Sequence, residues 1–303
     1  MPNNHAIRRI YWLHALTPTH AGVGRGLGYI DLPIDREKVT NWPIIRGSAF
    51  KGVLADYFGA TDERRKKDEL LRAAFGVTGA EEESNSGSLV PTDARLVCLP
   101  IRSFRGTFAW CTSPLALTVL RRMLQLAGVA HLPDAPTPLE ETKAHHPKSS
   151  ALVESKKVYL EELDFDGVEC PVAQSWAEKI AAWVFGSSQE WQQHFQKRFA
   201  IVPDVAFDYF CQTGTEVHTR VRINDETKTV VEGALWTEES LPAETLLAGV
   251  IQCERVFQQN GKSQNSIEPA RLMDHFAKEE LVLQIGGKAT VGRGQMRCVF
   301  VSV

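Results

Sequence analysis

The amino-acid sequence predicts an α+β fold, on the strength of three observations. Short apolar or β-branched runs, typical of strands, alternate with stretches whose apolar residues recur at helical spacing. One pair of β-branched runs near residue 220 is polar on both faces, which predicts a hairpin that projects from the body. The composition, 43% hydrophobic and 23% charged over 303 residues, is that of a globular protein able to bury a core. We find no tandem repeat.

The first part of the chain predicts a strand, a glycine-rich loop and two helices. Residues 10–16 are typical of a strand buried on both faces, and glycine occupies every second position over 22–28. Ser48 is placed to cap the N-terminus of a helix whose apolar positions face a core. A charged helix is expected over about 62–75, and Gly76 ends it.

The middle of the chain predicts strands, helices and an insertion. Ser113 followed by Pro114 is a strong helix start, because a capping residue precedes a proline at the first helical position. Residues 131–150 are rich in proline, histidine and charge, so we expect a mobile insertion there. The regular elements expected here are strands at 94–103 and 106–112 and helices near 172–185 and 188–198.

The last third of the chain contains the polar hairpin. Residues 215–223 and 228–236 are joined at 224–227, which predicts one long hairpin. Because polar side chains occupy both of its faces, neither face belongs to a core and the hairpin is expected to project. Strands near 244–254, 280–285 and 295–302 and a helix near 268–278 complete the α+β pattern.

Several protein classes are disfavoured by composition. No stretch approaches the roughly 18 apolar residues of a membrane span, so no membrane partner is expected. No apolar segment follows Arg8 and Arg9, which argues against a secretory signal. The six cysteines are scattered without a CxxC pair, which disfavours a zinc ribbon or a disulfide framework and suits a reducing cytoplasm.

The formal net charge of −3 hides an asymmetry between the ends and the middle of the chain. Residues 1–60 hold seven Lys or Arg against four Asp or Glu, and residues 281–303 hold three basic residues and no acid. If the two ends meet, they form a basic surface on an acidic body, as a polyanion requires. The alternative is ordinary solvated surface charge.

Two glycine-rich segments are candidate phosphate-binding loops. The segment 22–28 does not match the GxGxxG fingerprint, and 286–290 lacks the first glycine of a P-loop, so neither is a recognised nucleotide cradle. Glycines nevertheless let backbone amides approach a phosphate, and Arg25, Lys288 and Arg293 can add charge. Plain turn chemistry is the alternative.

Other candidate residues lie between these loops in the sequence. Lys51 falls in the first turn of the helix after Ser48, where free amides favour an anion. His20 and Asp31 flank the first glycine loop, so they can act in general acid–base catalysis, or Asp31 can hold Mg²⁺. Asp31 is otherwise a turn residue. The pairs Glu238-Glu239 and His145-His146 are expected to be surface features.

Four ordered blocks resemble the RAMP superfamily of CRISPR proteins, and in particular the backbone subunit of the type III-B (Cmr) effector. The blocks are HAGVG (20–24), IDLPI (30–34), Arg36-Glu37 and PIIRGSAFKG (43–52); DARLVCLPIRS (93–103) with FAWCTSP (108–114); GALWTEESLPAET (233–245); and GGKATVGRG (286–294). They cover nearly the whole chain.

The resemblance implies one RAMP domain over 1–303. Its RRM-like, ferredoxin-like palm is formed by about 1–60, 88–130 and 244–303, with a helical insertion at about 131–200. The polar hairpin, about 213–243, is the projecting β-hairpin thumb. Such subunits stack into a filament along CRISPR RNA, beside other Cmr subunits.

The resemblance also implies a function. Each thumb crosses and kinks the guide–target duplex, and the subunit cleaves target RNA at regular intervals beside the kink. The family's catalytic aspartate corresponds to Asp31. The reaction needs a divalent metal, Mg²⁺ or Mn²⁺, and the target's own 2′-OH attacks to leave a cyclic phosphate and a 5′-OH. Asp31 is the implied metal ligand. His20 is a further candidate. The residues expected to bind RNA are Arg25, Arg36, Arg46, Ser48, Lys51, Gly287, Lys288 and Arg293.

The chain departs from the family's pattern at a few positions. Ala49 and Phe50 stand where a serine and a leucine are common, Asp56 where arginine is common, and Asp35 where glutamine is common. Arg46 precedes the Gly-Ser pair. Two other functions stay open: a subunit that holds RNA without cutting it, and a metal-independent ribonuclease that processes precursor RNA with His20.

Overall fold

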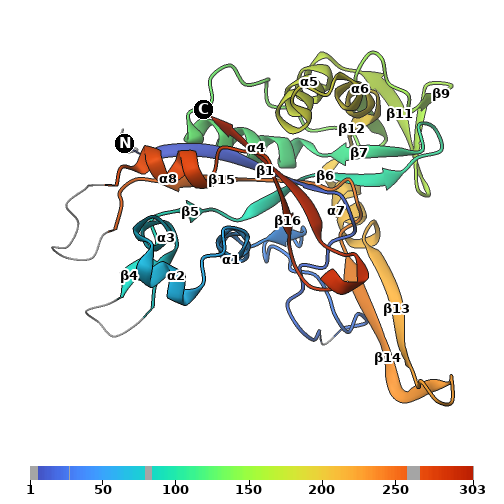
Figure 1. Cartoon of the computed structure of the whole chain (residues 1–303). Helices are drawn as coiled ribbons and strands as arrows, with labels where there is room; N and C mark the ends of the chain where they lie inside the picture. The colour runs from blue at the N-terminus through green and yellow to red at the C-terminus, as the bar shows by residue number, and fades with distance from the viewer. Residues whose placement is uncertain (1–5, 27, 79–83, 258–266, 303) are drawn as a thin grey trace.

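The structure, a computed structural model, describes residues 6–26, 28–78, 84–257 and 267–302. Figure 1 shows a central sheet with helices on both sides and one long hairpin that extends away from the body. Helices α1, α2 and α3 lie on the same side of the sheet as the hairpin, and α5 and α6 lie on the other. This arrangement confirms the predicted α+β fold with a projecting thumb.

Four antiparallel strands form the centre of the sheet in the order β17-β1-β15-β6. They are β1 (Ile7–Ala15), β6 (Ala94–Arg102), β15 (Leu246–Cys253) and β17 (Gln295–Ser302). The first crossover, from β1 to β6, contains α1 (Gly47–Tyr57), and the second, from β15 to β17, contains α8 (Pro269–Phe276). Strand order and crossovers are those of a ferredoxin-like βαββαβ unit, so the predicted palm is confirmed.

Strand β1 separates two hydrophobic cores. Tyr11 and Leu13 face the core that contains α1, where Tyr11 stacks on Phe50 with ring centroids 4.2 Å apart. Ile10 and Trp12 face the core beneath α5 and α6. All four β1 side chains are fully buried. Because side chains alternate between the faces of a strand, a strand with a core on each side must be apolar throughout.

The helices before β6 begin differently from the prediction. Helix α1 starts at Gly47, one residue before Ser48, and the Gly47 amide donates to the Asp93 carboxylate at 2.8 Å. Ser48 is therefore an exposed first-turn residue and not the cap. The charged helix is split at Asp68, whose carboxylate accepts from the Leu70 and Leu71 amides and starts a new helix. The two halves are α2 (Asp62–Lys67) and α3 (Glu69–Phe75), which Gly76 ends as predicted.

The segment 131–200 contains strands as well as helices. Residues 143–146, within the stretch expected to be mobile, form β8 and pair with both β11 and β12. The expected helical insertion is thus corrected to a mixed one, because its strands extend the palm sheet beyond β7. Its elements are β8 (Lys143–His146), β9 (Val153–Glu154), β10 (Lys157–Leu160), β11 (Leu163–Glu169), α5 (Pro171–Phe185), α6 (Gln189–Arg198) and β12 (Phe199–Ile201).

The remaining elements connect these parts. Helix α4 begins at Pro114 and the Ser113 hydroxyl accepts from the Ala116 amide, which confirms the predicted helix start. Helix α7 was not among the elements expected from the sequence. The other elements are β2 (Ile44–Ile45), β3 (Gly76–Val77), β4 (Asn85–Ser86), β5 (Val90–Pro91), β7 (Phe108–Thr112), α4 (Pro114–Ala127), α7 (Asp204–Thr213), β16 (Leu281–Gln284) and the 3₁₀ turn η1 (Ala289–Val291).

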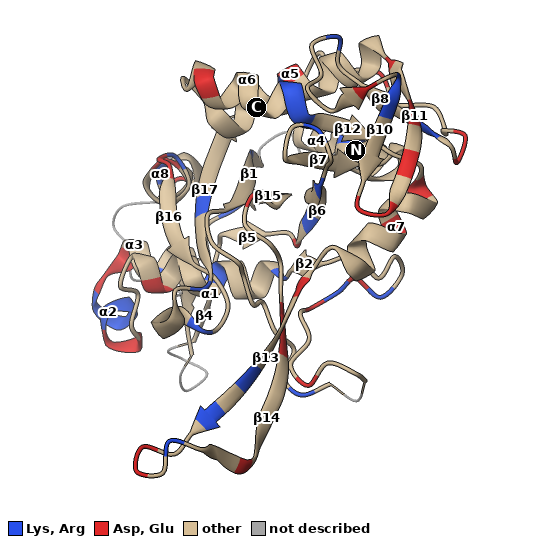
Figure 2. Ribbon diagram, turned by 90° about the vertical axis from the view of Figure 1, so that its right-hand side faces the viewer, with Lys and Arg blue, Asp and Glu red and all other residues tan. Residues whose placement is uncertain are grey.

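The thumb consists of β13 (Glu216–Ile223) and β14 (Val230–Ser240), paired antiparallel. Its outer half is exposed, whereas Glu238, Glu239 and Ser240 at its inner end are buried. Figure 2 shows acidic positions where β14 joins the body and basic positions farther out on β13.

Within the described residues, no helix is long and apolar enough to cross a membrane.

Candidate functional site at the root of the thumb

The two glycine-rich segments, far apart in sequence, lie side by side. The Gly287 amide donates to the His20 carbonyl at 3.0 Å, and the Gly294 amide donates to the Pro18 carbonyl at 2.9 Å. Gly286 has a φ of +81°, and a Cβ there would lie 2.2 Å from the His20 carbonyl oxygen, so only glycine permits this approach. The predicted meeting of the two chain ends is therefore confirmed.

Three consecutive residues of β14, Thr237, Glu238 and Glu239, hold this junction together, and we call them the thumb root. The Leu32 amide donates to the Thr237 carbonyl, and the Glu239 amide donates to the Leu32 carbonyl, both at 3.0 Å. The segment that carries Asp31 is thus attached to the thumb strand by backbone hydrogen bonds. The thumb strand therefore fixes the position of the Asp31 segment.

Asp31 is exposed, and Thr237 fixes its carboxylate. The Thr237 amide and hydroxyl donate to Asp31 Oδ2 at 2.8 and 3.0 Å. These bonds, together with the nearby charge of Arg25, hold the pKa of Asp31 below its ordinary value. Among the described residues, Asp31 Oδ1 has no hydrogen-bond partner. The carboxylate is therefore ionised at neutral pH and presents one oxygen to a ligand.

Glu239 connects the Asp31 segment to the base of the thumb. It is 2% exposed, and its carboxylate accepts from the Ile34 amide at 3.0 Å, from Arg36 Nη2 at 2.5 Å and from the Thr215 hydroxyl at 2.9 Å. Its backbone carbonyl accepts from His20 Nδ1 at 2.6 Å. A buried carboxylate with several donors offsets its desolvation and fixes the groups around it.

Glu238 connects the C-terminal glycine loop to the base of the thumb. Its carboxylate accepts from Lys288 Nζ and from Trp236 Nε1, each at 2.7 Å, and lies 3.4 Å from Arg220 Nε. Burial raises the pKa of Glu238, but the Lys288 and Trp236 hydrogen bonds outweigh burial and leave the pKa below its ordinary value. The expectation that Glu238 and Glu239 are surface features is wrong, because cations from distant loops allow both to be buried.

His20 lies inside the junction and is 7% exposed. Because a carbonyl only accepts, the bond to Glu239 places a proton on Nδ1. A Cβ on Gly22 would lie 2.4 Å from Nε2, so the ring packs against the backbone of the first glycine loop. This geometry suits a residue that joins the two loops.

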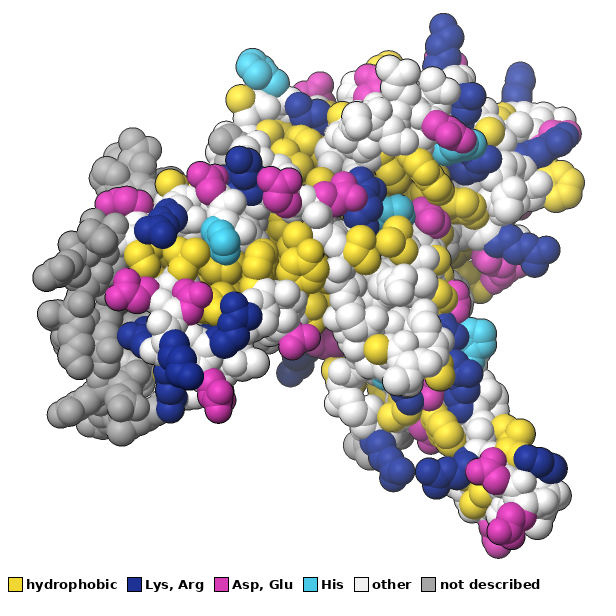
Figure 3. Space-filling model, viewed as in Figure 1, with side chains coloured by type: hydrophobic (Ala, Val, Ile, Leu, Met, Phe, Trp, Pro, Cys, Tyr) yellow, Lys and Arg dark blue, Asp and Glu magenta, His cyan; other side chains and the backbone are white. Residues whose placement is uncertain are grey.

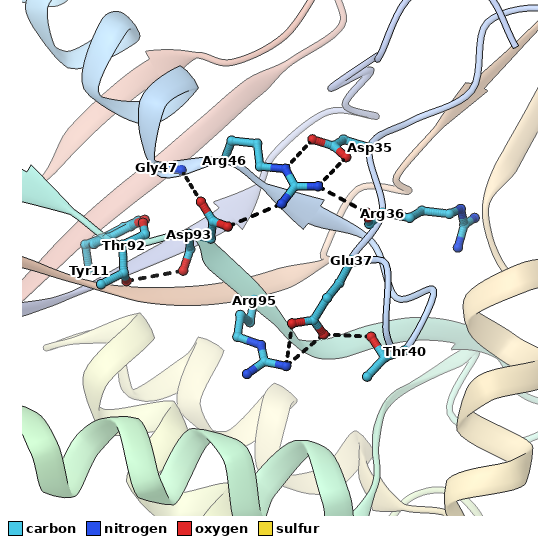
Figure 4. Close-up of polar contacts among 10 residues, drawn as sticks. All are labelled: Tyr11, Asp35, Arg36, Glu37, Thr40, Arg46, Gly47, Thr92, Asp93 and Arg95. Atoms are coloured by element: carbon cyan, nitrogen blue, oxygen red, sulfur yellow. Dashed lines mark hydrogen bonds and ion pairs between the residues drawn. The ribbon is translucent and has the colours of Figure 1, made fainter.

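Arg46 lies between Asp35 and Asp93, as Figure 4 shows. Its guanidinium donates to both oxygens of Asp35, at 2.7 and 2.9 Å, and to Asp93 at 3.4 Å. Asp35 is one of the positions at which the chain departs from its family's pattern, and it pairs with the arginine before the Gly-Ser pair. The hydrogen bond to Asp35 and the charges of both acids raise the pKa of Arg46. Arg46 therefore stays cationic.

The other residues predicted to bind RNA surround the junction without converging on one point. Arg293 Nη1 lies 3.0 Å from Glu216, whereas Arg25 is exposed on the first glycine loop. Lys51 is half-buried in α1, and burial followed by the charge of Arg65 lowers its pKa. Among the described residues, Arg25 and Lys51 have no carboxylate partner. Most of the predicted cations are thus already paired within the protein.

The described residues contain no group of three or more His, Cys, Asp or Glu side chains that could hold a metal ion. Asp31 is a single exposed carboxylate with one unpaired oxygen. Mg²⁺ commonly keeps several waters and is held by one or two carboxylates together with substrate phosphates. The site therefore fits a divalent ion only if RNA and water supply its remaining ligands. His145 and His146, expected at the surface, lie in β8; the expectation is wrong for His146, which is buried and whose Nδ1 donates to the Pro147 carbonyl at 2.9 Å.

Comparisons with known proteins agree with this geometry. The RAMP superfamily model matches residues 12–297. The CRISPR system Cmr endoribonuclease Cmr4 of Pyrococcus furiosus is 33% identical over 298 residues, which are 96% of this chain and 95% of the relative. The CMR subunit Cmr4 of Saccharolobus solfataricus is 23% identical and covers 94% of this chain and 93% of its own length.

Solved structures show the same fold. Crystalline oligomeric Cmr4 from Pyrococcus furiosus aligns with a TM-score of 0.71 at 26% identity, covering 98% of each chain. A chain of the type III-B Cmr-β complex bound to cognate target RNA aligns with a TM-score of 0.72 at 19% identity, again over 98% of each chain. The match at 33% identity over 96% of this chain and the family model over residues 12–297 show the family. The chain belongs to the RAMP superfamily and, within it, to the Cmr4 family of type III-B endoribonuclease subunits.

Proposed function

We propose that this chain binds CRISPR RNA in a type III-B effector and cleaves the guide-paired target RNA at regular intervals, with Asp31 as the catalytic residue. The observation that carries the proposal is the exposed, ionised carboxylate of Asp31, fixed by Thr237 where both glycine-rich loops meet the thumb. Relatives solved as an oligomer and in a complex with target RNA support the proposed partners. These are CRISPR RNA, target RNA, further copies of this chain and other Cmr subunits.

The proposed chemistry is an internal transesterification of the target strand. The 2′-oxygen attacks the adjacent phosphorus, the bond from phosphorus to the 5′-oxygen breaks, and the products carry a cyclic 2′,3′-phosphate and a 5′-OH. The 2′-OH loses a proton and the leaving 5′-oxygen gains one. Holding the strand out of A-form geometry brings the 2′-oxygen in line with the scissile bond, and such positioning supplies much of the rate enhancement.

Asp31 either takes the proton of the 2′-OH or helps to hold a divalent ion, Mg²⁺ or Mn²⁺. Such an ion would supply charge to neutralise the pentacoordinate phosphorus. In both roles the carboxylate must be ionised and fixed, and Thr237 provides both conditions through its two hydrogen bonds to Oδ2. Thr237 is therefore a positioning residue for Asp31. The burial of His20 restricts its direct access to RNA.

The RNA backbone is proposed to replace protein carboxylates at the paired cations. Base pairing reads the target sequence, so the protein needs only amides and a few cations along the strand. Lys288 is paired with Glu238 and Arg46 with Asp35, so an incoming phosphate competes with a carboxylate for each cation. Because phosphate contacts are electrostatic, removal of Lys288 is expected to weaken binding equally for all RNA sequences.

The test uses the assembled complex and a complementary RNA labelled at either end. The proposal expects regularly spaced products with Mg²⁺ or Mn²⁺, no products with EDTA, and cyclic phosphate and 5′-OH ends. Tight binding without products under any condition would contradict it in favour of a subunit that only holds RNA. EDTA-resistant cutting of precursor RNA by the isolated chain would contradict it in favour of a processing ribonuclease.

A further inference from the structure

A cavity lined by both polar and apolar side chains lies on the opposite side of β1 from the Asp31 junction. Its volume is about 560 Å³, and it opens between the end of β1, the turn at Gly186–Ser188 after α5, the start of α6 and β17. His14 lines it from β1, on the same strand face as Ile10 and Trp12 and opposite to Tyr11 and Leu13. The cavity is therefore separated by the sheet from the α1 side of the palm.

His14 places an unsatisfied polar atom beside this cavity. The side chain is 4% exposed, and its Nε2 donates to Glu244 Oε2 at 2.8 Å. Its Nδ1 is buried and has no hydrogen-bond partner among the described residues. A buried polar atom without a partner destabilises the protein, so a ligand that orders the groups around His14 would be favoured.

The other polar groups of the cavity are mostly acceptors. Glu244 uses one carboxylate oxygen for His14, and Glu280 uses one for Arg297 Nε at 2.6 Å, which leaves a second oxygen on each. The two glutamate side chains are 25% and 51% exposed. With Arg297 as the single permanent cation in the lining, the cavity carries a net negative charge. It therefore favours a cationic donor and disfavours a phosphate.

An aromatic wall completes the cavity. Phe185 and Trp191 stack with centroids 5.9 Å apart and planes inclined by 13°, and Trp191 is 44% exposed. The guanidinium carbon of Arg297 already lies 5.9 Å from the Phe185 ring centroid. Aromatic faces attract cations, and a planar guanidinium both stacks on them and donates to carboxylates. Figure 3 shows charged side chains of both signs beside apolar ones where β16 and β17 lie below α5.

We propose that this cavity binds the guanidinium group of an arginine presented by a neighbouring polypeptide. The group would stack on Trp191 and donate to the free carboxylate oxygens of Glu244 and Glu280, next to His14. An RNA strand is disfavoured because the cavity is acidic and because it lies across the sheet from the α1 side of the palm. The cavity lies close to the root of the thumb. Glu244 follows β14 in the sequence, and its amide donates to the Ala15 carbonyl at the end of β1. An arginine bound there would brace the chain that leaves the thumb root.

The test is a titration of the full chain with Nα-acetyl-L-arginine methylamide, followed by the ¹⁵N resonances of the histidine rings. The matched probe is the corresponding citrulline amide, which has the same shape without the charge. We expect the His14 Nδ1 resonance to shift with the arginine probe, with at least tenfold weaker binding of the citrulline probe. Glu244→Gln should weaken arginine binding at least tenfold, whereas Glu169→Gln, at an exposed position on β11, should not change it.

Glu280→Gln provides a second variant if Glu244→Gln does not fold, because Glu280 is more exposed. It should also weaken arginine binding. Equal binding of the arginine and citrulline probes, or no shift at His14, would overturn the proposal. Tighter binding of adenosine monophosphate than of the arginine probe would overturn it in favour of a nucleic-acid ligand. Since none of these readouts depends on RNA cleavage, failure here leaves the proposed ribonuclease function intact.

Discussion

The two ends of the thumb place charged and apolar side chains in opposite environments. At the root, Glu238 and Glu239 are 5% and 2% exposed, although charged residues usually lie at the surface. Toward the tip, Val221 and Leu235 are 44% and 65% exposed, although apolar residues usually lie inside. The difference shows that exposure in this hairpin depends on what the rest of the chain brings to it and not on the side chains themselves.

The groups that contact each end of the thumb explain why the root is buried and the tip is exposed. The root receives Lys288 and Arg36 from the loops that converge on it, and these cations with several N–H donors offset the desolvation of two carboxylates. The tip has no second layer, so its apolar side chains find no core. Apolar side chains on a projecting hairpin suit contact with nucleobases, which agrees with the proposed crossing of the guide–target duplex.

The largest expected effect is a difference in the free energy of unfolding between a substitution at the root of the thumb and one near its tip. Glu239→Ala leaves the largely buried Arg36 guanidinium without its partner, and breaking such a pair costs about 3–5 kcal/mol. Chemical denaturation measures this loss. Glu232→Ala, at an exposed position near the tip, should change the free energy of unfolding by no more than about 0.5 kcal/mol. Equal losses for the two variants would contradict the distinction.

The second effect concerns the positioning of Asp31. Thr237→Val removes the hydroxyl donor to Asp31 and keeps the side-chain shape, so target cleavage should fall about tenfold. The pKa of Asp31, followed by carboxyl ¹³C NMR, should rise toward its ordinary value because a bond to the ionised form is lost. Thr237→Ser should restore both properties. Thr229→Val, near the tip, serves as the matched control; an unchanged Asp31 pKa in Thr237→Val would refute the positioning role.

A third effect is the pH dependence of stability at the root. The folded-state pKa of Glu238 is depressed, so its contribution to stability is present above its unfolded pKa and is lost as pH falls through the folded value. Glu238→Gln should therefore be less stable than the wild type at about pH 7, and the difference should shrink below about pH 4. Denaturation curves at both pH values measure this. Glu232→Gln should show no such convergence.

The smallest expected effect on stability lies at the tip. Leu235→Ser exposes no core, so the free energy of unfolding should change by less than about 0.5 kcal/mol. Cleavage of guide-paired target should nevertheless fall, while binding of CRISPR RNA alone is retained. Assays with guide alone and with guide–target duplex distinguish these steps. A variant that cleaves as the wild type does would remove the tip from the proposed mechanism.

Local signals in the sequence were sufficient for the palm strands and the hairpin but not for every element. The apolar run of β1, the Ser113-Pro114 helix start and the hairpin each follow from neighbouring residues, so each could be predicted. The start of α1 could not, because the group that caps it is Asp93, 46 residues away. The strands of the insertion were missed for a similar reason, since β8 depends on pairing with β11 and β12.

Only part of the candidate site could be predicted from the sequence. Asp31, Lys288 and Arg36 were chosen as candidates from their motifs, but the residues that hold them were not. Thr237 is 206 positions from Asp31, and Glu239 is 203 positions from Arg36, so no local pattern connects them. The sequence offers one signal for the buried acids of the thumb root, namely two adjacent glutamates, Glu238 and Glu239, shortly before a buried strand. In the sequence this pattern resembles an ordinary solvated turn.

Cleavage by an assembled complex that carries Asp31→Asn tests the account most directly. The substitution keeps the shape of the side chain and removes its charge, so assembly and binding of guide and target should be unchanged. The rate of target cleavage under single-turnover conditions should fall at least about 100-fold. Regularly spaced products formed at the wild-type rate by this variant would contradict the account.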